Sequence, residues 1–295
     1  MRIAPPDQAE AASPHQGFVP IKNRPPEQHI GKAAHIVGTE ALALVRFGLR
    51  APHDPCIVDT VQAIDALLKV ETPYGPVWRR YPEDQYGEHA DGSPFDGTGI
   101  GRGWPLLTGA RAHYELAAGR REVAERLLRV MEMLANEGGM LPEQTWDAPD
   151  IPARGLCFGR PAGSGMPLVW AHAEYIKLRR SLHEGRVFDT PPQTVQRYVL
   201  EKTGSPYAVW RFNNKCSTMP VGKTLRLEVL APALVHWSTD GWQTVYDTPT
   251  WDTGLGMHVA DVDTTALSPG DAVEFTFYWP EAERWEQMNF YMTIE

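Results

Sequence analysis

Residues 104–147 read WPLLTGARAHYELAAGRREVAERLLRVMEMLANEGGMLPEQTWD, and they predict two consecutive helices followed by a loop. The first helix is expected from Trp104 to Ala118, because a proline suits its first turn and a glycine suits the position after its end. The second is expected over 121–136, where apolar side chains recur every three or four residues: Val123, Leu127, Val130 and Leu134. The paired glycines at 138–139 end it, so this half of the chain is built from helices joined by loops.

The loop after these helices carries a carboxylate, Glu143, which follows a proline and precedes Gln144 and Trp146. A carboxylate on a polar loop between two helices lies at a helix rim, where it stays ionised and can reach a water molecule. A group of this kind can activate water beside a sugar. The alternative, on these residues alone, is an ordinary solvated glutamate.

Upstream of this stretch the sequence predicts two further helices. Residues 1–31 are rich in proline without periodicity and are expected to form a lead-in. One helix is expected over about 32–49. Another begins after Asp54, a favoured N-cap residue, with Pro55 at its first position. Its apolar residues follow a helical spacing: Ile57, Val61, Ile64 and Leu68.

Two long segments of the helical half show no sustained period. Residues 72–103 are rich in Gly, Pro, Asp and Tyr, and a stretch of this length without structure in a compact domain is usually functional. The loop that contains Glu143 continues to Gly165. A fifth helix is expected from Pro167, with these side chains directed inward: Leu168, Ala171, Tyr175, Leu178 and Leu182.

After Gly185 the pattern changes to that of strands. Apolar and polar side chains alternate over 225–230, 257–262 and 273–279, and turn signals at 240–241 and 269–270 separate them. This pattern predicts an all-β sandwich. The predicted organisation is therefore a lead-in (1–31), a helical domain (32–188) and a β-sandwich (189–295), with the boundary near Pro191-Pro192.

Composition argues against several function classes. The formal net charge of −9 argues against nucleic-acid binding, because a phosphate-binding surface needs clustered Lys and Arg. No stretch is apolar enough to span a membrane. The cysteines Cys56, Cys157 and Cys216 are too widely spaced for a metal site or a disulfide framework, so no cofactor is expected. No signal peptide is visible, which fits a cytoplasmic chain and equally a fragment of a larger exported protein.

Four stretches of the chain resemble the glucoamylases of glycoside hydrolase family 15. They are TPYGPVWRRYPEDQYG (72–87), WPLLTGARAHYELAAG (104–119), LPEQTWD (141–147) and PLVWAHAEY (167–175). The resemblance covers roughly residues 20–183, and the β half resembles the module appended to bacterial glucoamylases and glucodextranases. It is specific, because several motifs with uncommon residues occur in the same order.

The resemblance implies a multi-domain α and β architecture in which part of an (α/α)6 toroid precedes the β-sandwich. It also implies an exo-acting hydrolase that releases glucose from the non-reducing ends of α-glucans or maltooligosaccharides with inversion. In an inverting mechanism one carboxylic acid protonates the leaving oxygen while a second carboxylate activates water on the opposite face of the sugar. Glu143 matches the general base of the family.

The resemblance further implies substrate-binding residues. Arg80 matches an arginine that grips sugar hydroxyls, for which the five donors of a guanidinium are suited. Its alternative is a salt bridge to Asp84 or Glu83. Asp84 and Tyr86 are expected to be neighbours in the same pocket wall. The other substrate-binding residues implied by the resemblance are Trp104, Trp170 and Gln144, and each has a structural alternative. For the two tryptophans the alternative is packing in the core, which is the favoured role for Trp170. For Gln144 it is an amide that only holds the fold.

The pattern departs from the family on the N-terminal side. The family's general acid precedes these motifs in a Trp-Glu-Glu context, which is missing before residue 72, and the similar string Arg284-Trp-Glu-Gln287 lies in the β half. Only about half of the twelve helices of a toroid are expected. We therefore expect the C-terminal part of a glucoamylase that is weakly active or inactive by itself, with a missing N-terminal portion of the same enzyme as its partner.

Two other interpretations remain open. The chain is either a fragment complemented by a neighbouring chain or a non-catalytic glucan-binding protein, in which Trp237, Trp242 and Trp251 present aromatic faces to glucan. The first two of these tryptophans flank a predicted hairpin turn and equally suit packing in the sandwich. The linkage of the substrate (α-1,4, α-1,6 or trehalose) and the oligomeric state are not specified by the sequence.

Overall fold

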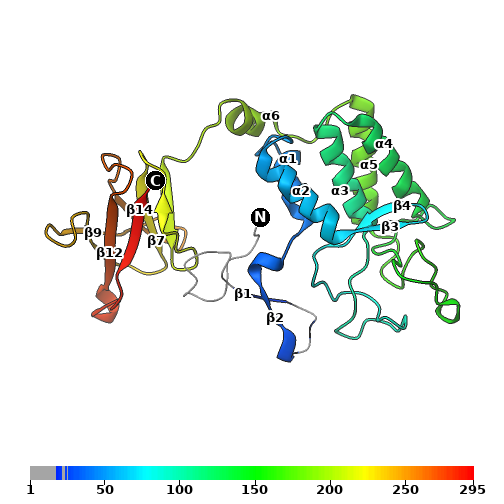
Figure 1. Ribbon diagram of the computed structural model, residues 1–295, viewed down its shortest axis with the longest axis horizontal. Helices are drawn as coiled ribbons and strands as arrows, with labels where there is room; N and C mark the ends of the chain where they lie inside the picture. The colour runs from blue at the N-terminus through cyan, green and yellow to red at the C-terminus, as the bar shows by residue number, and fades with distance from the viewer. Residues whose placement is uncertain (1–17, 22–23, 25) are drawn as a thin grey trace. The chain divides into compact units, whose positions relative to one another are not determined.

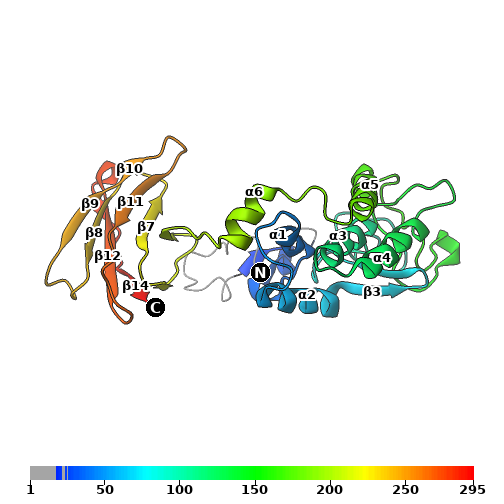
Figure 2. The ribbon, with the colours of Figure 1, turned by 90° about the horizontal axis from the view of Figure 1, so that it is seen from above.

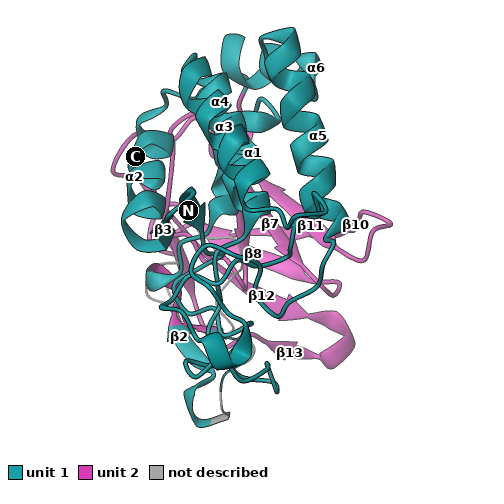
Figure 3. Cartoon of the chain, turned by 90° about the vertical axis from the view of Figure 1, so that its right-hand side faces the viewer, with its two compact units in different colours: residues 1–3, 20–31, 35–203 teal, residues 4–19, 32–34, 204–295 magenta. Residues whose placement is uncertain are grey.

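The computed structural model describes residues 18–21, 24 and 26–295, which form two compact units (Figures 1 and 3). The described residues of 20–31 and 35–203 belong to a helical unit, and those of 18–19, 32–34 and 204–295 belong to a β unit. Most of the predicted lead-in (1–31) lies outside the described residues. Its described part contains two short paired strands, β1 (Phe18–Pro20) and β2 (Ile30–Lys32). No helix in the described part of the chain has the length and apolar character to span a membrane.

The single helix predicted over 32–49 is wrong. This segment forms two 3-10 turns, Ala33–His35 and Thr39–Leu42, followed by one short helix, α1 (Ala43–Arg46). Gly38 explains the break, because it precedes the second turn with an extended backbone (φ −135°, ψ 150°). Glycine in a helix interior is also roughly 1 kcal/mol less favourable than alanine.

The other four predicted helices are confirmed as α2 (Pro55–Leu68), α3 (Pro105–Ala117), α4 (Arg121–Met133) and α5 (Val169–Glu184). The side chain of Asp54 caps α2 by accepting a hydrogen bond from the backbone N–H of Cys56 at 3.0 Å. All four apolar residues predicted for the inner face of α2 are buried. Helices α3, α4 and α5 pack against one another (Figures 1 and 2), and their apolar faces form the core of this unit.

The segment 72–103 contains more regular structure than its lack of periodicity predicts. Strands β3 (Lys69–Thr72) and β4 (Gly75–Trp78) form a hairpin that packs on α4. Gly75 has φ +121°, and a Cβ atom there would lie 2.4 Å from Val130 on α4, so this position requires glycine. The chain then runs without helix or strand from 79 to 103, and this loop reaches the candidate site.

Beyond α5, the helical unit continues past the predicted boundary near Pro191-Pro192. A helical turn, α6 (Pro192–Thr194), leads into a π-helical turn, Val195–Leu200, and the chain leaves the unit between Thr203 and Gly204. The proline pair starts this helix because proline suits the first helical position. The hydroxyl of Thr194 also donates to the backbone carbonyl of Phe47, which ties the segment to α1.

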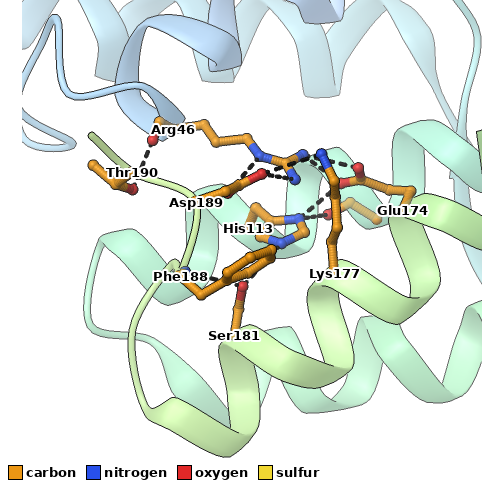
Figure 4. Close-up of polar contacts among 9 residues, drawn as sticks. Arg46, His113, Glu174, Lys177, Ser181, Phe188, Asp189 and Thr190 are labelled. Carbon is orange, nitrogen blue, oxygen red and sulfur yellow. Dashed lines mark hydrogen bonds and ion pairs between the residues drawn. The ribbon is translucent and has the colours of Figure 1, made fainter.

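A buried ion cluster joins α1, α3 and α5 (Figure 4). Arg46 donates to both carboxylate oxygens of Glu174 at 2.8 Å and pairs with Asp189 at 2.8 Å. His113 Nδ1 lies 2.7 Å from Glu174 Oε1, and His113 Nε2 lies 3.2 Å from the hydroxyl of Ser181. These contacts fix the relative positions of three helices, two of which, α3 and α5, begin next to Trp104 and Trp170.

The β unit is a two-sheet sandwich (Figure 2), and the three strands predicted from alternation are confirmed as β7, β11 and β12. One sheet has the strand order β10-β11-β7-β5, and the other has the order β6-β14-β12-β8-β9 with β13 paired to β12. The strands are β5 (Tyr207–Arg211), β6 (Thr218–Met219), β7 (Thr224–Val229), β8 (Leu234–Ser238), β9 (Tyr246–Pro249), β10 (Trp251–Asp252), β11 (His258–Val262), β12 (Ala272–Trp279), β13 (Arg284–Trp285) and β14 (Phe290–Ile294).

The two sheets share one apolar core around the buried indole of Trp210. Leu225 and Leu227 of β7 enter it from one sheet, and Phe275 and Phe277 of β12 enter it from the other. The predicted order, a helical unit followed by an all-β unit, is confirmed. The toroidal arrangement of the helices stays a prediction.

Candidate active site

Glu143 lies on the loop between α4 and α5, and the backbone holds this loop firmly. The N–H of Glu143 donates to the carbonyl of Gly165 at 2.8 Å, and the N–H of Leu141 donates to His172 Nε2 on α5 at 3.0 Å. The half-buried Glu143 lines a hollow of about 510 Å³ together with Tyr86. The backbone of Glu143 is therefore fixed in position, and its side chain is accessible to a ligand.

The hydroxyl of Tyr86 faces this carboxylate. Burial raises the pKa of Tyr86, the negative charge of Glu143 raises it further, and Arg80 lowers it by a smaller amount. The phenol consequently stays protonated well beyond neutral pH, so it can act as a hydrogen-bond donor toward Glu143. A neutral donor beside a carboxylate steadies its orientation without neutralising its charge.

Arg80 forms the salt bridge that the residues alone left open as an alternative. Its Nε and Nη2 atoms donate to the two carboxylate oxygens of Asp84, each at 2.7 Å, and the backbone N–H of Tyr86 donates to Asp84 Oδ1 at 3.0 Å. Burial by itself lowers the pKa of Arg80, but the hydrogen bond and charge of Asp84 outweigh it, and the net pKa is raised. Asp84 accepts hydrogen bonds from two of the five donors, and no other described residue accepts one, so within the described part of the chain the others remain for a ligand.

Arg80 also lines a second hollow of about 450 Å³, together with Trp104 and Trp170. Its guanidinium carbon lies 5.1 Å from the ring centroid of Tyr86 and 5.0 Å from that of Trp104, within the range of cation–π attraction. Because Tyr86 lines the first hollow and Trp104 the second, this stack links the two. The structure therefore places the charged and aromatic residues implied by the resemblance in two neighbouring hollows, with Arg80 between Tyr86 and Trp104.

The two tryptophans of the second hollow differ in exposure. Trp104, at the N-terminus of α3, is 5 % exposed and forms part of the wall. Trp170 in the first turn of α5 is 63 % exposed, so the core role favoured for it from the sequence is wrong. Its indole face is free to contact a ligand at the edge of the hollow.

Comparison with known proteins shows what part of this chain is similar to. The chain matches no family model. It is 45 % identical over 166 residues to a glucoamylase of Clostridium sp. (strain G0005), which covers 56 % of this chain and 22 % of that enzyme. The crystal structure of a bacterial glucoamylase complexed with acarbose aligns with a TM-score of 0.56 and 41 % identity, covering 62 % of this chain and 25 % of that structure.

Part of this chain is glucoamylase-like. The lineage is that of a glycoside hydrolase, and the chain spans a quarter or less of the length of these two relatives. A cycloisomaltooligosaccharide glucanotransferase of Niallia circulans is 29 % identical over 97 residues, which cover 29 % of this chain and 10 % of that enzyme.

Within the glucoamylase-like part, Gln144 has a structural environment. It is buried, its Nε2 donates to the carbonyl of Tyr86 at 2.9 Å, and its Oε1 accepts from the backbone N–H of Arg102 at 3.0 Å. The side-chain amide thus joins the α4–α5 loop to two points of the loop over 79–103 and holds Tyr86 in place. Its predicted role in binding substrate stays a prediction.

A second brace of the same loops was not found from the sequence. The carboxylate of Asp147 is fully buried and pairs with Arg79 at 2.7 Å and with Arg102 at 3.3 Å. The guanidinium of Arg102 also lies 4.0 Å from the ring centroid of Trp146. Asp147 belongs to the LPEQTWD motif, so the motif itself was the signal for this position.

Glu88 is a further acidic residue of the first hollow that the sequence interpretation missed. It is 6 % exposed, and its Oε2 atom is buried without a hydrogen-bond partner among the described residues. A buried, unpaired acceptor is costly, so it marks a position where a ligand hydroxyl gains a partner. It follows Tyr86 by two residues, and this proximity was the available signal.

Proposed function

We propose that this chain is the base-bearing, C-terminal portion of an inverting, exo-acting α-glucan hydrolase that releases glucose from non-reducing ends. The observation that supports it most is the placement of Glu143, which lines a hollow beside Tyr86 and near Arg80. Glucoamylase likeness over part of the chain supports the same class of substrate.

In the proposed mechanism Glu143 is the general base. Its carboxylate takes a proton from a water molecule as the water oxygen bonds to the anomeric carbon. The bond to the leaving glucosyl oxygen breaks on the opposite face, and a separate carboxylic acid protonates that oxygen. Tyr86 holds the carboxylate, the free N–H groups of Arg80 grip hydroxyls of the terminal glucose, and Trp104 and Trp170 provide the apolar wall.

The general acid is proposed to come from a polypeptide portion that the relatives carry outside the matched residues. The chain spans 22 % of the Clostridium glucoamylase, so most of that enzyme lies outside the matched residues. Loss of an acid or base group typically lowers a rate by about 10²–10⁴-fold. The chain by itself is therefore expected to hydrolyse maltose very slowly.

The experiment that tests this proposal is complementation. Glucose release from maltose is measured for the full chain alone, and for the chain mixed with a polypeptide covering the part of the Clostridium glucoamylase that precedes the matched residues. The mixture is expected to be at least about 100-fold faster than the chain alone. Turnover by the chain alone equal to that of an intact glucoamylase would refute the shared-site proposal.

The matched control is Glu143→Gln, which keeps the shape of the side chain and removes the base. The mixture with Glu143→Gln is expected to stay as slow as the chain alone. The first sugar released by the active mixture is expected to be β-glucose, observed by NMR before mutarotation, because inversion of an α-linkage gives the β-anomer. Initial release of α-glucose contradicts the role of Glu143 as a base that acts on water.

A further inference from the structure

The β unit carries a cluster of aromatic rings that the proposed hydrolase does not use. We call it the aromatic patch, and it consists of His236 on β8, Trp242 on the β8–β9 loop, Tyr278 on β12 and Trp285 on β13. The rings of His236 and Trp242 stack with centroids 5.6 Å apart at 18°. Trp285 stands edge-on to His236, at 5.3 Å and 72°, and contacts Tyr278 at 5.2 Å.

The strand register places these rings on the outer face of the sheet. Tyr278 of β12 pairs directly with Trp285 of β13, and residues opposite each other in an antiparallel pair share a face. Neighbouring residues along the strands, Val235 of β8 and Phe277 of β12, are completely buried in the sandwich core. Successive side chains alternate between faces, so the patch faces away from that core.

Backbone strain is concentrated around the patch. Among the described residues, four that are not glycine have positive φ, and three of them are Trp242 (+66°), Glu283 (+48°) and Gln287 (+61°). The last two bracket β13, which carries Trp285. Left-handed backbone is unfavourable for residues with a side chain and persists where surrounding contacts enforce it, often at ligand sites.

Hydrogen bonds hold Trp242 in this conformation. The hydroxyl oxygen of Ser238 accepts from the backbone N–H of Trp242 at 3.0 Å, and Asp240 Oδ1 accepts from the N–H of Thr244 at 2.8 Å. The Thr244 hydrogen bonds, followed by the one from Ser238, lower the pKa of Asp240 to about 2. The loop is therefore braced throughout the neutral and mildly acidic range, and the indole is positioned before any ligand arrives.

Trp237 does not belong to the patch, although the sequence interpretation grouped it with Trp242. It points to the inner side of β8, stacks on Tyr246 at 4.6 Å and donates its Nε1 hydrogen to Thr248 at 3.0 Å. The two tryptophans lie on opposite faces of one sheet. The second tryptophan of the patch is instead Trp285, which contacts His236 as Trp242 does, is 45 % exposed and is distant in sequence.

We propose that the aromatic patch binds an α-linked glucan chain, independently of the hydrolytic site. The apolar faces of glucose rings stack on indoles, and an open surface of several aromatic rings suits this contact. Trp242 and Trp285 are steeply inclined to each other, which fits a chain that turns between successive glucose units, as α-glucans do, rather than a flat β-1,4-linked ribbon. Asp247, which lies 2.7 Å from His236 Nδ1, gives the patch a polar edge for hydroxyls.

The test is native affinity electrophoresis of the full chain in gels containing soluble starch, dextran or hydroxyethyl cellulose. Starch or dextran is expected to retard the chain, and the dissociation constant is expected to rise roughly tenfold or more in Trp242→Ala and in Trp285→Ala. The matched control is Trp251→Ala. The sequence interpretation grouped Trp251 with Trp242, but Trp251 is 51 % exposed on β10 of the other sheet and lies outside the patch, so its removal should not change retardation.

A second variant separates binding from folding. Trp242→Gly removes the indole and also relieves the positive φ, so its midpoint of thermal unfolding should not fall, whereas its retardation should be lost as in Trp242→Ala. Unchanged retardation of both Trp242→Gly and Trp285→Ala, or retardation by hydroxyethyl cellulose as strong as by starch, overturns the proposal. Repeating the gels with Glu143→Gln, which should still be retarded, keeps this outcome separate from that of the proposed hydrolase.

Discussion

The two units of this protein position their proposed sugar-binding residues in different ways. The helical unit places Glu143 and Tyr86 on long loops, and buried charges such as Asp147 and Glu174 hold the loops and helices together. The β unit places Trp242 and Trp285 on a sheet face, where strand register and short strained turns position them. In the helical unit, ion pairs hold the loops that carry the proposed catalytic residues. In the β unit, the sheet itself holds the aromatic rings. Different perturbations should therefore destabilise or inactivate the two units.

The largest effect is expected from Asp147→Ala. This change leaves Arg102, which is 2 % exposed, without its carboxylate partner, and removal of one member of a buried ion pair costs about 3–5 kcal/mol. Urea unfolding followed by tryptophan fluorescence should show a lower midpoint for the helical unit and an unchanged midpoint for the β unit. Equal loss in both transitions would mean that the units do not fold independently. Asp147→Asn, which keeps the shape and one acceptor, should lose less.

The second-largest difference between the two units is expected in their stability at acidic pH. Burial by itself raises the pKa of Glu174, but the hydrogen bond and charge of His113 and the charge of Arg46 outweigh it, and the net pKa is lowered from 4.5. A depressed carboxyl pKa contributes stability that is complete above its unfolded value and is lost as the pH falls through the folded value. The unfolding free energy of the helical unit should therefore fall below about pH 4.5.

The control for this prediction is the β unit, in which the pKa of Asp240 is about 2. The retardation that depends on Trp242 should therefore persist at pH values where the helical unit has begun to weaken. Glu174→Gln should flatten the pH dependence of the helical unit between pH 3 and pH 5. A helical unit whose stability is the same at pH 3.5 and pH 7 would contradict the assigned role of the Glu174 cluster.

A smaller effect is expected when Tyr86→Phe removes the hydroxyl that we propose donates to Glu143 in the same hollow. Hydrogen bonds to charged groups contribute about 1.5–3 kcal/mol, so glucose release by the complemented chain should fall roughly 10- to 100-fold. The retardation by starch that depends on the aromatic patch should not change, and neither should the unfolding midpoints. Loss of activity together with a lower midpoint of the helical unit would show that the hydroxyl supports the fold and not the base.

The sequence predicted helices well where a cap and a spacing agreed, as in α2 with Asp54, Pro55 and its four buried apolar residues. It failed over 32–49, where Gly38 interrupts an apolar run that was interpreted as one helix. It also missed the hairpin β3–β4, because the proline and glycine of its turn mark only a break in the pattern. Capping residues and apolar spacing thus predicted the elements that depend on neighbouring residues alone.

The residues of the two sites divide in the same way, into those with a local signal in the sequence and those that only the fold brings together. The glucoamylase resemblance pointed to Glu143, Arg80 and Tyr86, but the linking stack of Arg80 between Tyr86 and Trp104 depends on a fold that joins distant segments. Trp242 and Trp285 lie 43 positions apart in the sequence and reach the same aromatic patch only through the register of β8, β12 and β13. No periodicity in the sequence encodes that pairing, so it could not have been predicted from the residues.

The smallest expected effect concerns Trp170, and it compares two tryptophans of one hollow. On a helix Trp170 lies roughly 100° from Ala171, which is buried, so it falls beside the inward face and not on it. Trp170→Ala should change the unfolding free energy by no more than about 0.5 kcal/mol, whereas Trp104→Ala should cost about 3–5 kcal/mol because it empties a packed site. The measurement is urea unfolding of the helical unit for both variants. If Trp170→Ala is the more destabilising change, the indole packs into the helices and is not available at the mouth of the hollow.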